Sequence, residues 1–256
     1  MKRFLAALLA ALTVFTLTGC GKTENPAEPV TPGQGEEPAA PTEPELTPEE
    51  IAEQERLAAE KAREERLQGL LDSMTLEEKV GQLFFVRCPE TNAVEDISTY
   101  HLGGYLLFGR DYKDGDNWLT WEQFIQKIES YQDAAAIPLF IGSDEEGGTV
   151  TRASRNPNLF SEPFKSPQAI YSTGGMEALA QDALDKSQSL LDLGINVNFA
   201  PVCDVSTDPN DFIYDRTLGQ DAETTADYIT RTVLTMGDAG EMAVLKHFPG
   251  YGNNAD

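Results

Sequence analysis

The sequence predicts an α/β fold in which buried parallel strands alternate with helices. From residue 75 onward, short apolar runs of strand length alternate with longer segments of helical periodicity. Such alternation is typical of βαβ units and therefore of a parallel sheet. About five strands are recognisable, at residues 83–87, 103–109, 137–144, 196–203 and 242–248.

The helices between these strands carry start and stop signals. Thr75 and Glu78 have the spacing of a capping box, which predicts that the first helix of the fold begins there. Longer helices are expected at 117–135, 176–193 and 222–239. Gly194 and Gly240 follow the last two, where a left-handed C-cap favours glycine.

Two architectures fit this alternation. A complete (β/α)8 barrel has eight strands in about 250 residues, so we predict a TIM barrel of which only about the first five βα units are present. An open doubly wound sheet is the alternative. No G-x-G-x-x-G follows the first strand, so nothing in the sequence supports a dinucleotide site.

The first twenty residues, MKRFLAALLAALTVFTLTGC, read as a lipoprotein signal peptide. Two positive charges precede a short apolar stretch, as in export signals, and LTGC resembles the lipobox of bacterial lipoproteins. This predicts cleavage before Cys20 and attachment of lipid to its thiol. The alternative is an uncleaved anchor helix. Both place the chain outside the cytoplasm, held to the bacterial cell membrane.

Two further segments precede the α/β domain. Residues 21–48 are rich in Pro, Glu and Thr and poor in large apolar groups, which predicts a disordered linker. Residues 49–72 pair good helix formers with Glu and Lys or Arg at helical spacings, which predicts a solvated charged helix. The partial barrel is expected over 73–256.

Composition limits the possible partners. The formal net charge is −24, which argues against a nucleic-acid partner, and acidity of this kind is most often a solvated surface. Cys88 and Cys203 lie in or beside apolar runs, so buried free thiols are favoured over a disulfide between them.

Polar residues follow three of the strands. Asp144, Asp204 and the pair Lys246–His247 each come directly after an apolar run. The carboxyl ends of barrel strands converge on one face, where catalysis and binding occur. The alternatives are a helix cap or turn for each aspartate and an internal hydrogen-bond network for Lys246 and His247.

Two arginines extend this candidate site. Arg152 lies eight residues after Asp144, and Arg216 follows a loop aspartate. Cations beside carboxylates suit a hydroxyl-rich or carboxylated ligand, because charged groups make the stronger hydrogen bonds. No H-E-x-x-H or Cys-x-x-Cys spacing occurs, so we expect no metal and no cofactor.

Taken in order, these stretches resemble the N-terminal barrel of glycoside hydrolase family 3, and most closely its bacterial β-N-acetylhexosaminidase branch. The resemblance covers roughly residues 73–256 and rests on five motifs in the expected order. These motifs are MTLEEKVGQLFFV, GGYLLFGRD, IPLFIGSDEEGGTVTR, GINVNFAPVCDVSTDP with YDRTLG, and LKHFPGYGNNAD.

The resemblance implies roles for individual residues. A monosaccharide is expected to be held by the residues that match the branch's sugar-binding positions, namely Asp144, Arg152, Arg216, Lys246 and His247. Asp256 matches the aspartate that holds an acid/base histidine two residues later. That histidine and the nucleophilic aspartate would lie beyond the sequence, so the chain is expected to be a fragment without activity of its own.

The implied function is that of an exported lipoprotein glycosidase. It would cleave terminal β-linked N-acetylglucosamine from cell-wall or related glycans with retention of configuration, through a covalent intermediate. A non-catalytic sugar-binding lipoprotein and a β-glucosidase of the same family are the alternatives. Thr149, Tyr251 and Asp111 depart from the residues common in the family, so contacts to the aglycone are expected to differ more than contacts to the sugar.

Overall fold

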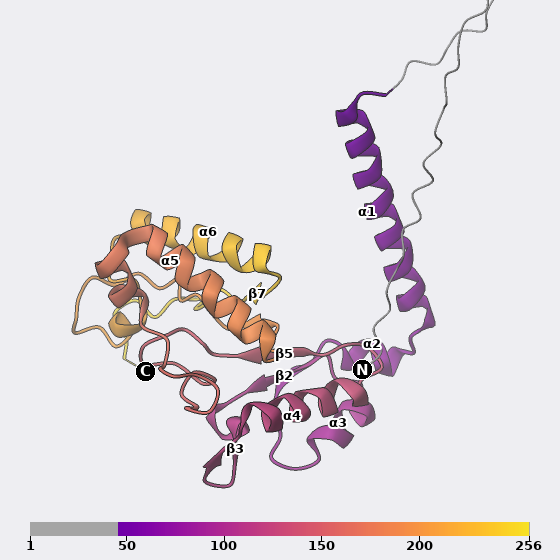
Figure 1. Ribbon diagram of the computed structural model, residues 1–256, viewed down its shortest axis with the longest axis horizontal. Helices are drawn as coiled ribbons and strands as arrows, with labels where there is room; N and C mark the ends of the chain where they lie inside the picture. Colours follow the sequence, from indigo (N-terminus) through magenta and orange to yellow (C-terminus); the bar gives the residue numbers. More distant parts are fainter. Residues whose placement is uncertain (1–45, 256) are drawn as a thin grey trace, which may run out of the picture. The chain divides into compact units, whose positions relative to one another are not determined.

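The computed structural model describes residues 46–255 (Figure 1). The predicted signal peptide, the lipidation site Cys20, almost all of the predicted linker and Asp256 therefore lie outside the described residues. The chain divides into two compact units, Met1–Glu55 and Arg56–Asp256. The second unit carries all the strands of the described part of the chain.

Helix α1, Pro48–Ser73, is the predicted charged helix. None of its residues is buried, and oppositely charged side chains pair along it at four-residue spacing, as in Arg56–Glu60 at 3.4 Å and Lys61–Glu65 at 3.8 Å. Exposed pairs of this kind each stabilise a helix by only about 0.2–0.5 kcal/mol. The boundary between the two units falls inside this helix.

The central sheet has five strands, all parallel, in the order β1-β2-β5-β6-β7. They are β1 Phe85–Arg87, β2 Gly104–Leu107, β5 Phe140–Ser143, β6 Val197–Asn198 and β7 Met242–Ala243. Strand order follows chain order without the reversal of a doubly wound sheet, which confirms the barrel prediction. Within the described residues the sheet is not closed, because β1 and β7 each have one neighbour. Each observed strand is shorter than the apolar run from which it was predicted.

The remaining elements connect these strands. They are α2 Leu76–Gly81, α3 Ala93–Tyr100, the 3-10 helix η1 Gly109–Tyr112, the antiparallel pair β3 Lys113–Asp114 and β4 Asn117–Trp118, α4 Trp121–Ala134, α5 Pro167–Asp192, the 3-10 helix η2 Tyr214–Arg216, and α6 Ala222–Ala239. Helices α3 and α4 lie together near β2, and α5 and α6 lie together near β7 (Figure 1).

The predicted helix signals are confirmed, with two corrected boundaries. Thr75 makes both bonds of its capping box, and Gly194 and Gly240 have φ of 76° and 92°. The helix predicted over 117–135 begins only at Trp121, because Thr120 forms a capping box with Gln123 and the residues before it form β4. The helix predicted from 176 begins at Pro167 instead, since the chain is helical on both sides of a kink at Gly175.

The core lies between the sheet and helices α3, α4 and α5. Tyr105, Leu107 and Ile141 of adjacent strands are fully buried against it. Tyr112 stacks on Phe124 with ring centroids 5.0 Å apart and donates a hydrogen bond to Ser143 at the end of β5. The carboxyl end of β5 is therefore held in place by Tyr112 and by the packing of Tyr112 on α4.

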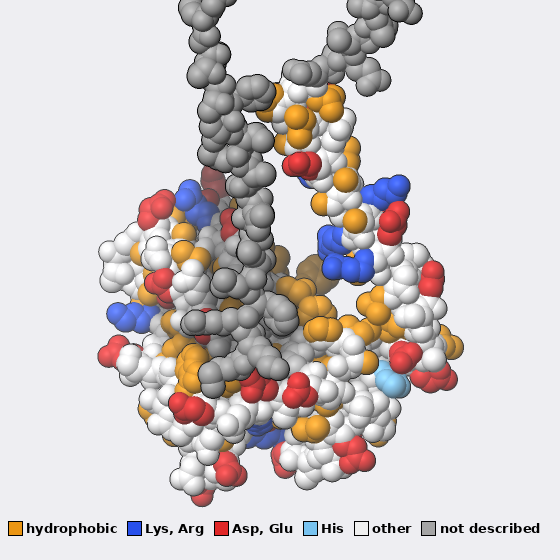
Figure 2. Space-filling view, turned by 45° about the vertical axis from the view of Figure 1, so that its right-hand side comes forward, with side chains coloured by type: hydrophobic (Ala, Val, Ile, Leu, Met, Phe, Trp, Pro, Cys, Tyr) orange, Lys and Arg blue, Asp and Glu red, His pale blue; other side chains and the backbone are white. Residues whose placement is uncertain are grey.

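Cys88 and Cys203 are both free thiols, as predicted; Cys88 is buried in the core, whereas Cys203 is only partly buried, contrary to the prediction. Among the described residues, no helix is long and apolar enough to cross a membrane. Acidic side chains are dispersed over the visible face and do not gather at one place, which agrees with a solvated acidic surface (Figure 2).

A buried carboxyl group, Glu241, lies between α5 and β7. Its Oε2 accepts a 2.7 Å hydrogen bond from Ser187, while its Oε1 has no hydrogen-bond partner among the described residues. Burial raises the pKa of Glu241 to about 7, although the Ser187 hydrogen bond and the Lys186 cation act in the opposite direction. This carboxyl group is thus easier to protonate in the folded protein than in the unfolded chain.

We predict that Glu241 makes the fold less stable as the pH rises. The folded protein binds this proton more tightly than the unfolded chain, so the stabilisation is complete below about pH 4.5 and is lost toward pH 7. The loss is on the order of 3 kcal/mol. Urea unfolding from pH 5 to 8 should show Glu241→Gln to be less sensitive to rising pH than the wild type. The exposed control Glu129→Gln should follow the wild type, and parallel curves for all three proteins would contradict the prediction.

Candidate functional site

Loops at the carboxyl ends of the parallel strands bring the five predicted binding residues together. Asp144 directly follows β5, and Arg152 lies in the loop after it. Arg216 is the last residue of η2, and Lys246 and His247 lie beyond β7. Direct contacts link these side chains, so the convergence predicted for barrel strand ends is observed.

Four of the charged side chains form what we call the ion-pair cluster, composed of Asp144, Glu146, Arg216 and Lys246. The Nζ atom of Lys246 lies 2.7 Å from Asp144 Oδ1 and 2.5 Å from Glu146 Oε1. Arg216 donates to both oxygens of Glu146, from Nε and Nη2, each at 2.9 Å. The hydrogen bonds to Glu146 raise the pKa of Arg216, although burial opposes this. Such two-pronged contacts fix direction as well as charge.

His247 is held by a second buried carboxylate, Asp204. The ring Nδ1 lies 2.6 Å from Asp204 Oδ2, and the backbone N–H of His247 donates to the same oxygen at 3.1 Å. The Nε2 atom of the ring faces Arg216 Nη2 at 3.2 Å. Because Arg216 can only donate, Nε2 accepts and Nδ1 carries the proton given to Asp204.

Hydrogen bonds keep Asp204 ionised. Burial raises the pKa of this carboxyl group, but the hydrogen bonds from the His247 ring, the Tyr251 backbone and the His247 backbone outweigh it, so the pKa lies below its usual value. The Tyr251 N–H donates to Oδ1 at 2.7 Å. Asp204 thus fixes both the histidine and the segment that follows it.

A third carboxylate, Glu145, shapes the loop that carries Arg152. It is fully buried and accepts hydrogen bonds from the backbone N–H groups of Arg152 and Ala153 and from the Ser154 hydroxyl. Asn198 on β6 holds the backbone of Glu145 through both its N–H and its carbonyl. These bonds place the Arg152 side chain near Asp144, with Nη2 3.8 Å from Oδ2.

Exposure separates the predicted residues from the carboxylates that hold them. The side chains of the five predicted binding residues are each 15–28% exposed, whereas those of Glu146 and Asp204 are 2% and 1% exposed. Solvent, and therefore a ligand, can reach the first group. The structure thus has an accessible face of charged and polar side chains that rests on buried carboxylates.

Sequence reasoning did not assign Glu146 and placed Asp204 only at a strand end. Glu146 stands in the acidic run Asp144–Glu146, and nothing in the sequence distinguishes it from Asp144; the fold makes the Glu146 side chain 2% exposed and that of Asp144 15% exposed. Asp111, a departure from the family pattern, is buried and accepts a hydrogen bond from the Phe108 N–H, so its carboxylate caps η1.

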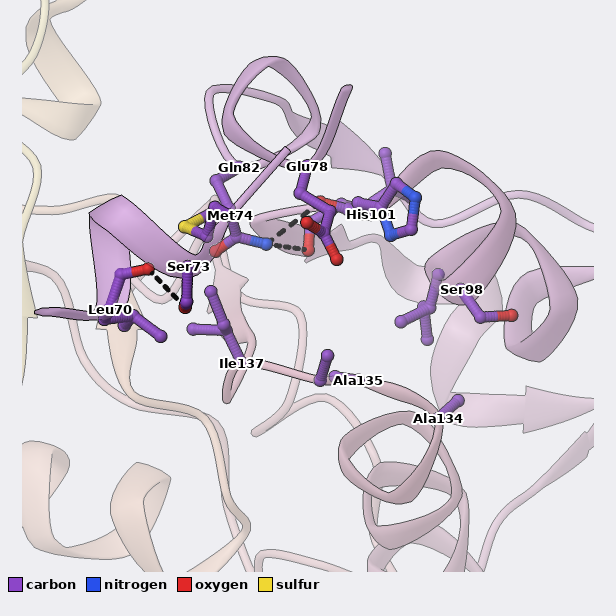
Figure 3. A pocket seen from close by; sticks show the side chains of 13 residues that line it. Leu70, Ser73, Met74, Glu78, Gln82, Ser98, His101, Ala134, Ala135 and Ile137 are labelled. Carbon is purple, nitrogen blue, oxygen red and sulfur yellow. Dashed lines mark hydrogen bonds between the residues drawn. The ribbon is translucent and has the colours of Figure 1, made fainter. Parts of the chain in front are cut away.

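A separate pocket of about 310 Å3 lies away from these residues (Figure 3). Leu70, Ile137 and other apolar side chains line it, and Gln82 donates across it to the backbone carbonyls of His101 and Leu102. It is lined by His101, the other of the chain's two histidines, but by none of the five predicted binding residues.

The chemistry of the accessible face suits a neutral ligand with many hydroxyl groups. Asp144 can accept hydrogen bonds from hydroxyls, and Lys246, Arg152 and Arg216 can donate to oxygens. The charges nearly balance within the cluster, so a neutral ligand meets no large net field. Among the described residues, no group of three or more His, Cys, Asp or Glu side chains could hold a metal ion.

Comparison with known proteins points to one family. Residues 75–256 match the family model described as the glycosyl hydrolase family 3 N terminal domain. The chain is 32% identical over 181 residues to beta-hexosaminidase LpqI of Mycobacterium tuberculosis, covering 70% of this chain and 44% of that protein. It is 32% identical over 160 residues to beta-hexosaminidase A of Pseudoalteromonas piscicida, covering 62% and 27%.

Solved structures agree with the sequence relatives. A glycoside hydrolase family 3 beta-N-acetylglucosaminidase from Paenibacillus sp. FPU-7 is 31% identical, with a TM-score of 0.60 over 71% of this chain and 34% of that chain. The Beta-N-acetylhexosaminidase from Beutenbergia cavernae is also 31% identical, with a TM-score of 0.58 over 70% and 55%. The chain spans less than half the length of the curated relatives it matches.

We predict that Glu146→Gln destabilises the fold by about 3 kcal/mol, because it leaves Arg216 and Lys246 partly buried without their shared counter-charge. Chemical unfolding of the protein that contains this chain measures the loss. The exposed control Glu162→Gln should change stability by less than about 0.5 kcal/mol. Equal stability of the two variants would show that Glu146 does not hold the cluster together.

Proposed function

Because the chain belongs to glycoside hydrolase family 3 through its N-terminal domain, we propose that the protein containing it hydrolyses terminal β-linked N-acetylglucosaminides. The accessible face formed by Asp144, Arg152, Arg216, Lys246 and His247 binds the terminal sugar. The observation that carries this proposal is the ion-pair cluster, in which partly exposed charged groups rest on a buried carboxylate. The names of the relatives, beta-hexosaminidase and beta-N-acetylglucosaminidase, support the choice of sugar.

Each residue of the face has a distinct task in this proposal. Asp144 accepts hydrogen bonds from two sugar hydroxyls, while Lys246 and Arg152 donate to neighbouring oxygens. Arg216 and His247 contact the opposite side of the sugar ring. In the structure, Nη2 of Arg216 and Nε2 of His247 already face each other. Since each of these groups is oriented before the sugar arrives, little ordering entropy is lost on binding.

The chemical step belongs to the same proposal. A retaining mechanism needs a nucleophile and an acid/base group. Asp256, predicted to hold an acid/base histidine, lies outside the described residues. We propose it for that role and cell-wall or related glycans as the substrate. A sugar-binding lipoprotein without catalysis and a β-glucosidase remain the alternatives.

We predict that Asp144→Ala lowers kcat/KM for 4-nitrophenyl N-acetyl-β-glucosaminide at least about thirtyfold. Loss of one partner of a buried hydrogen-bonded charge costs about 2–5 kcal/mol. Release of nitrophenol by the protein that contains residues 1–256 provides the measurement. Asp238→Asn, an exposed aspartate on α6, is the matched control and should retain wild-type activity.

The alternatives give different outcomes in the same assay. A β-glucosidase would prefer the corresponding glucoside, and a binding lipoprotein would hydrolyse neither substrate while calorimetry still detected N-acetylglucosamine. A loss under threefold in Asp144→Ala would place this carboxylate outside the sugar site.

We also propose that the mature protein begins at a lipid-modified Cys20 and is held to the bacterial membrane. Supporting this is the sequence LTGC at the end of an export-like segment. Cys20→Ala should move the protein from the membrane fraction to a soluble or unprocessed form. Immunoblotting of cell fractions and mass spectrometry of the N-terminal peptide test this. Unchanged membrane attachment, with no lipid mass on that peptide in the wild type, would contradict the proposal.

A further inference from the structure

A row of three aromatic rings leads from the ion-pair cluster to the surface. The ring of His247 meets that of Tyr251 edge-on, with centroids 4.8 Å apart at 84°. Tyr251 in turn contacts Phe212, with centroids 5.6 Å apart and planes tilted by 34°. We call these three residues the aromatic row. Its inner end is a predicted sugar-binding residue, and its outer end lies on a different loop.

Both loops that carry the row are held in place. The Tyr251 N–H donates to Asp204, the same carboxylate that orients His247. On the other loop, Asp211 accepts a 2.6 Å hydrogen bond from the buried Ser206, and Ile213 is fully buried. Phe212 lies between these two anchored residues, so its ring is held at the surface by its neighbours.

Phe212 exposes a large apolar surface beside a polar site. It is 48% exposed, although its neighbour Ile213 is completely buried. Its ring therefore offers apolar surface to a molecule that is bound at the polar site. His247 faces Arg216 of the ion-pair cluster at 3.2 Å and contacts Tyr251, so the aromatic row is the surface next to a ligand held by the cluster.

The chemistry of a sugar ring matches this arrangement. A pyranose has hydroxyl groups around its rim and C–H groups on its faces. The hydroxyls need charged or polar partners, which the ion-pair cluster offers, whereas the C–H faces pack on aromatic rings. A disaccharide therefore has one ring suited to the cluster and a second suited to the row.

Resting on the proposed function, we infer that Phe212 and Tyr251 form a second subsite, which binds the sugar ring on the far side of the cleaved linkage. The occupant is a pyranose joined through the glycosidic oxygen to the N-acetylglucosamine in the cluster. Phe212 is then a specificity-determining residue: it favours substrates whose leaving group is a sugar over those whose leaving group is small.

The test compares two substrates in the protein that contains this chain. One is the β-1,4-linked disaccharide of N-acetylglucosamine, and the other is methyl N-acetyl-β-glucosaminide, which has no second ring. Phe212→Ala should lower kcat/KM for the disaccharide about three- to tenfold, the range expected for one aromatic contact, and change that for the methyl glycoside less than twofold. Phe212→Tyr, which keeps the ring, should restore the preference.

Leu234→Ala, which removes an exposed apolar side chain on α6, is the control and should leave both values unchanged. Equal losses on the two substrates in Phe212→Ala, or no loss on either, would overturn the second subsite while leaving the proposed function intact. Failure of the wild-type protein to hydrolyse either substrate would instead refute the proposed function. In that case the ratio of disaccharide to monosaccharide affinity, measured by calorimetry for the same variants, still decides the subsite.

Discussion

The carboxylate of Glu146 is the constraint on which the arrangement of the site depends. Its side chain is 2% exposed and receives three contacts from cations that come from the end of β7 and from η2. An unpaired carboxylate so deeply buried would cost several kcal/mol. The two loops must therefore approach the end of β5, and in doing so they bring Arg216, Lys246 and His247 to Asp144.

The sequence was sufficient to predict the sheet, the helix signals and the five residues of the accessible face. Apolar runs of strand length that end in charged residues predict a parallel sheet and the edge where its polar groups gather. The sequence did not predict which cation pairs with which carboxylate. Lys246 could contact any carboxylate in the run Asp144–Glu146, and only the course of the chain determines that Glu146 turns inward and Asp144 outward. Contacts across 70 and 102 residues depend on packing, which periodicity does not encode.

The errors in helix boundaries have local causes of the same kind. Asn117 and Trp118 fit a helical pattern, but the capping box at Thr120 starts α4 later and leaves them to pair with β3. Gly175 kinks α5 without ending it. A helix predicted to begin after this glycine therefore misses the helical turns between Pro167 and Gly175. Cap geometry determines both boundaries, and its effect becomes visible only when the competing hydrogen bonds are known.

In the proposed function, the double contact of Lys246 lets the face accept a ligand without destabilising the fold. Its ammonium group bridges Asp144, which is 15% exposed, and Glu146, which is almost inaccessible. A hydroxyl group that donates to Asp144 would compete with the Asp144 contact of Lys246 and not with its contact to Glu146. Arg216 holds Glu146 through two further hydrogen bonds. The buried carboxylate of Glu146 thus has partners that a ligand at Asp144 would not displace, so in the proposed function the binding free energy is not spent on breaking the cluster.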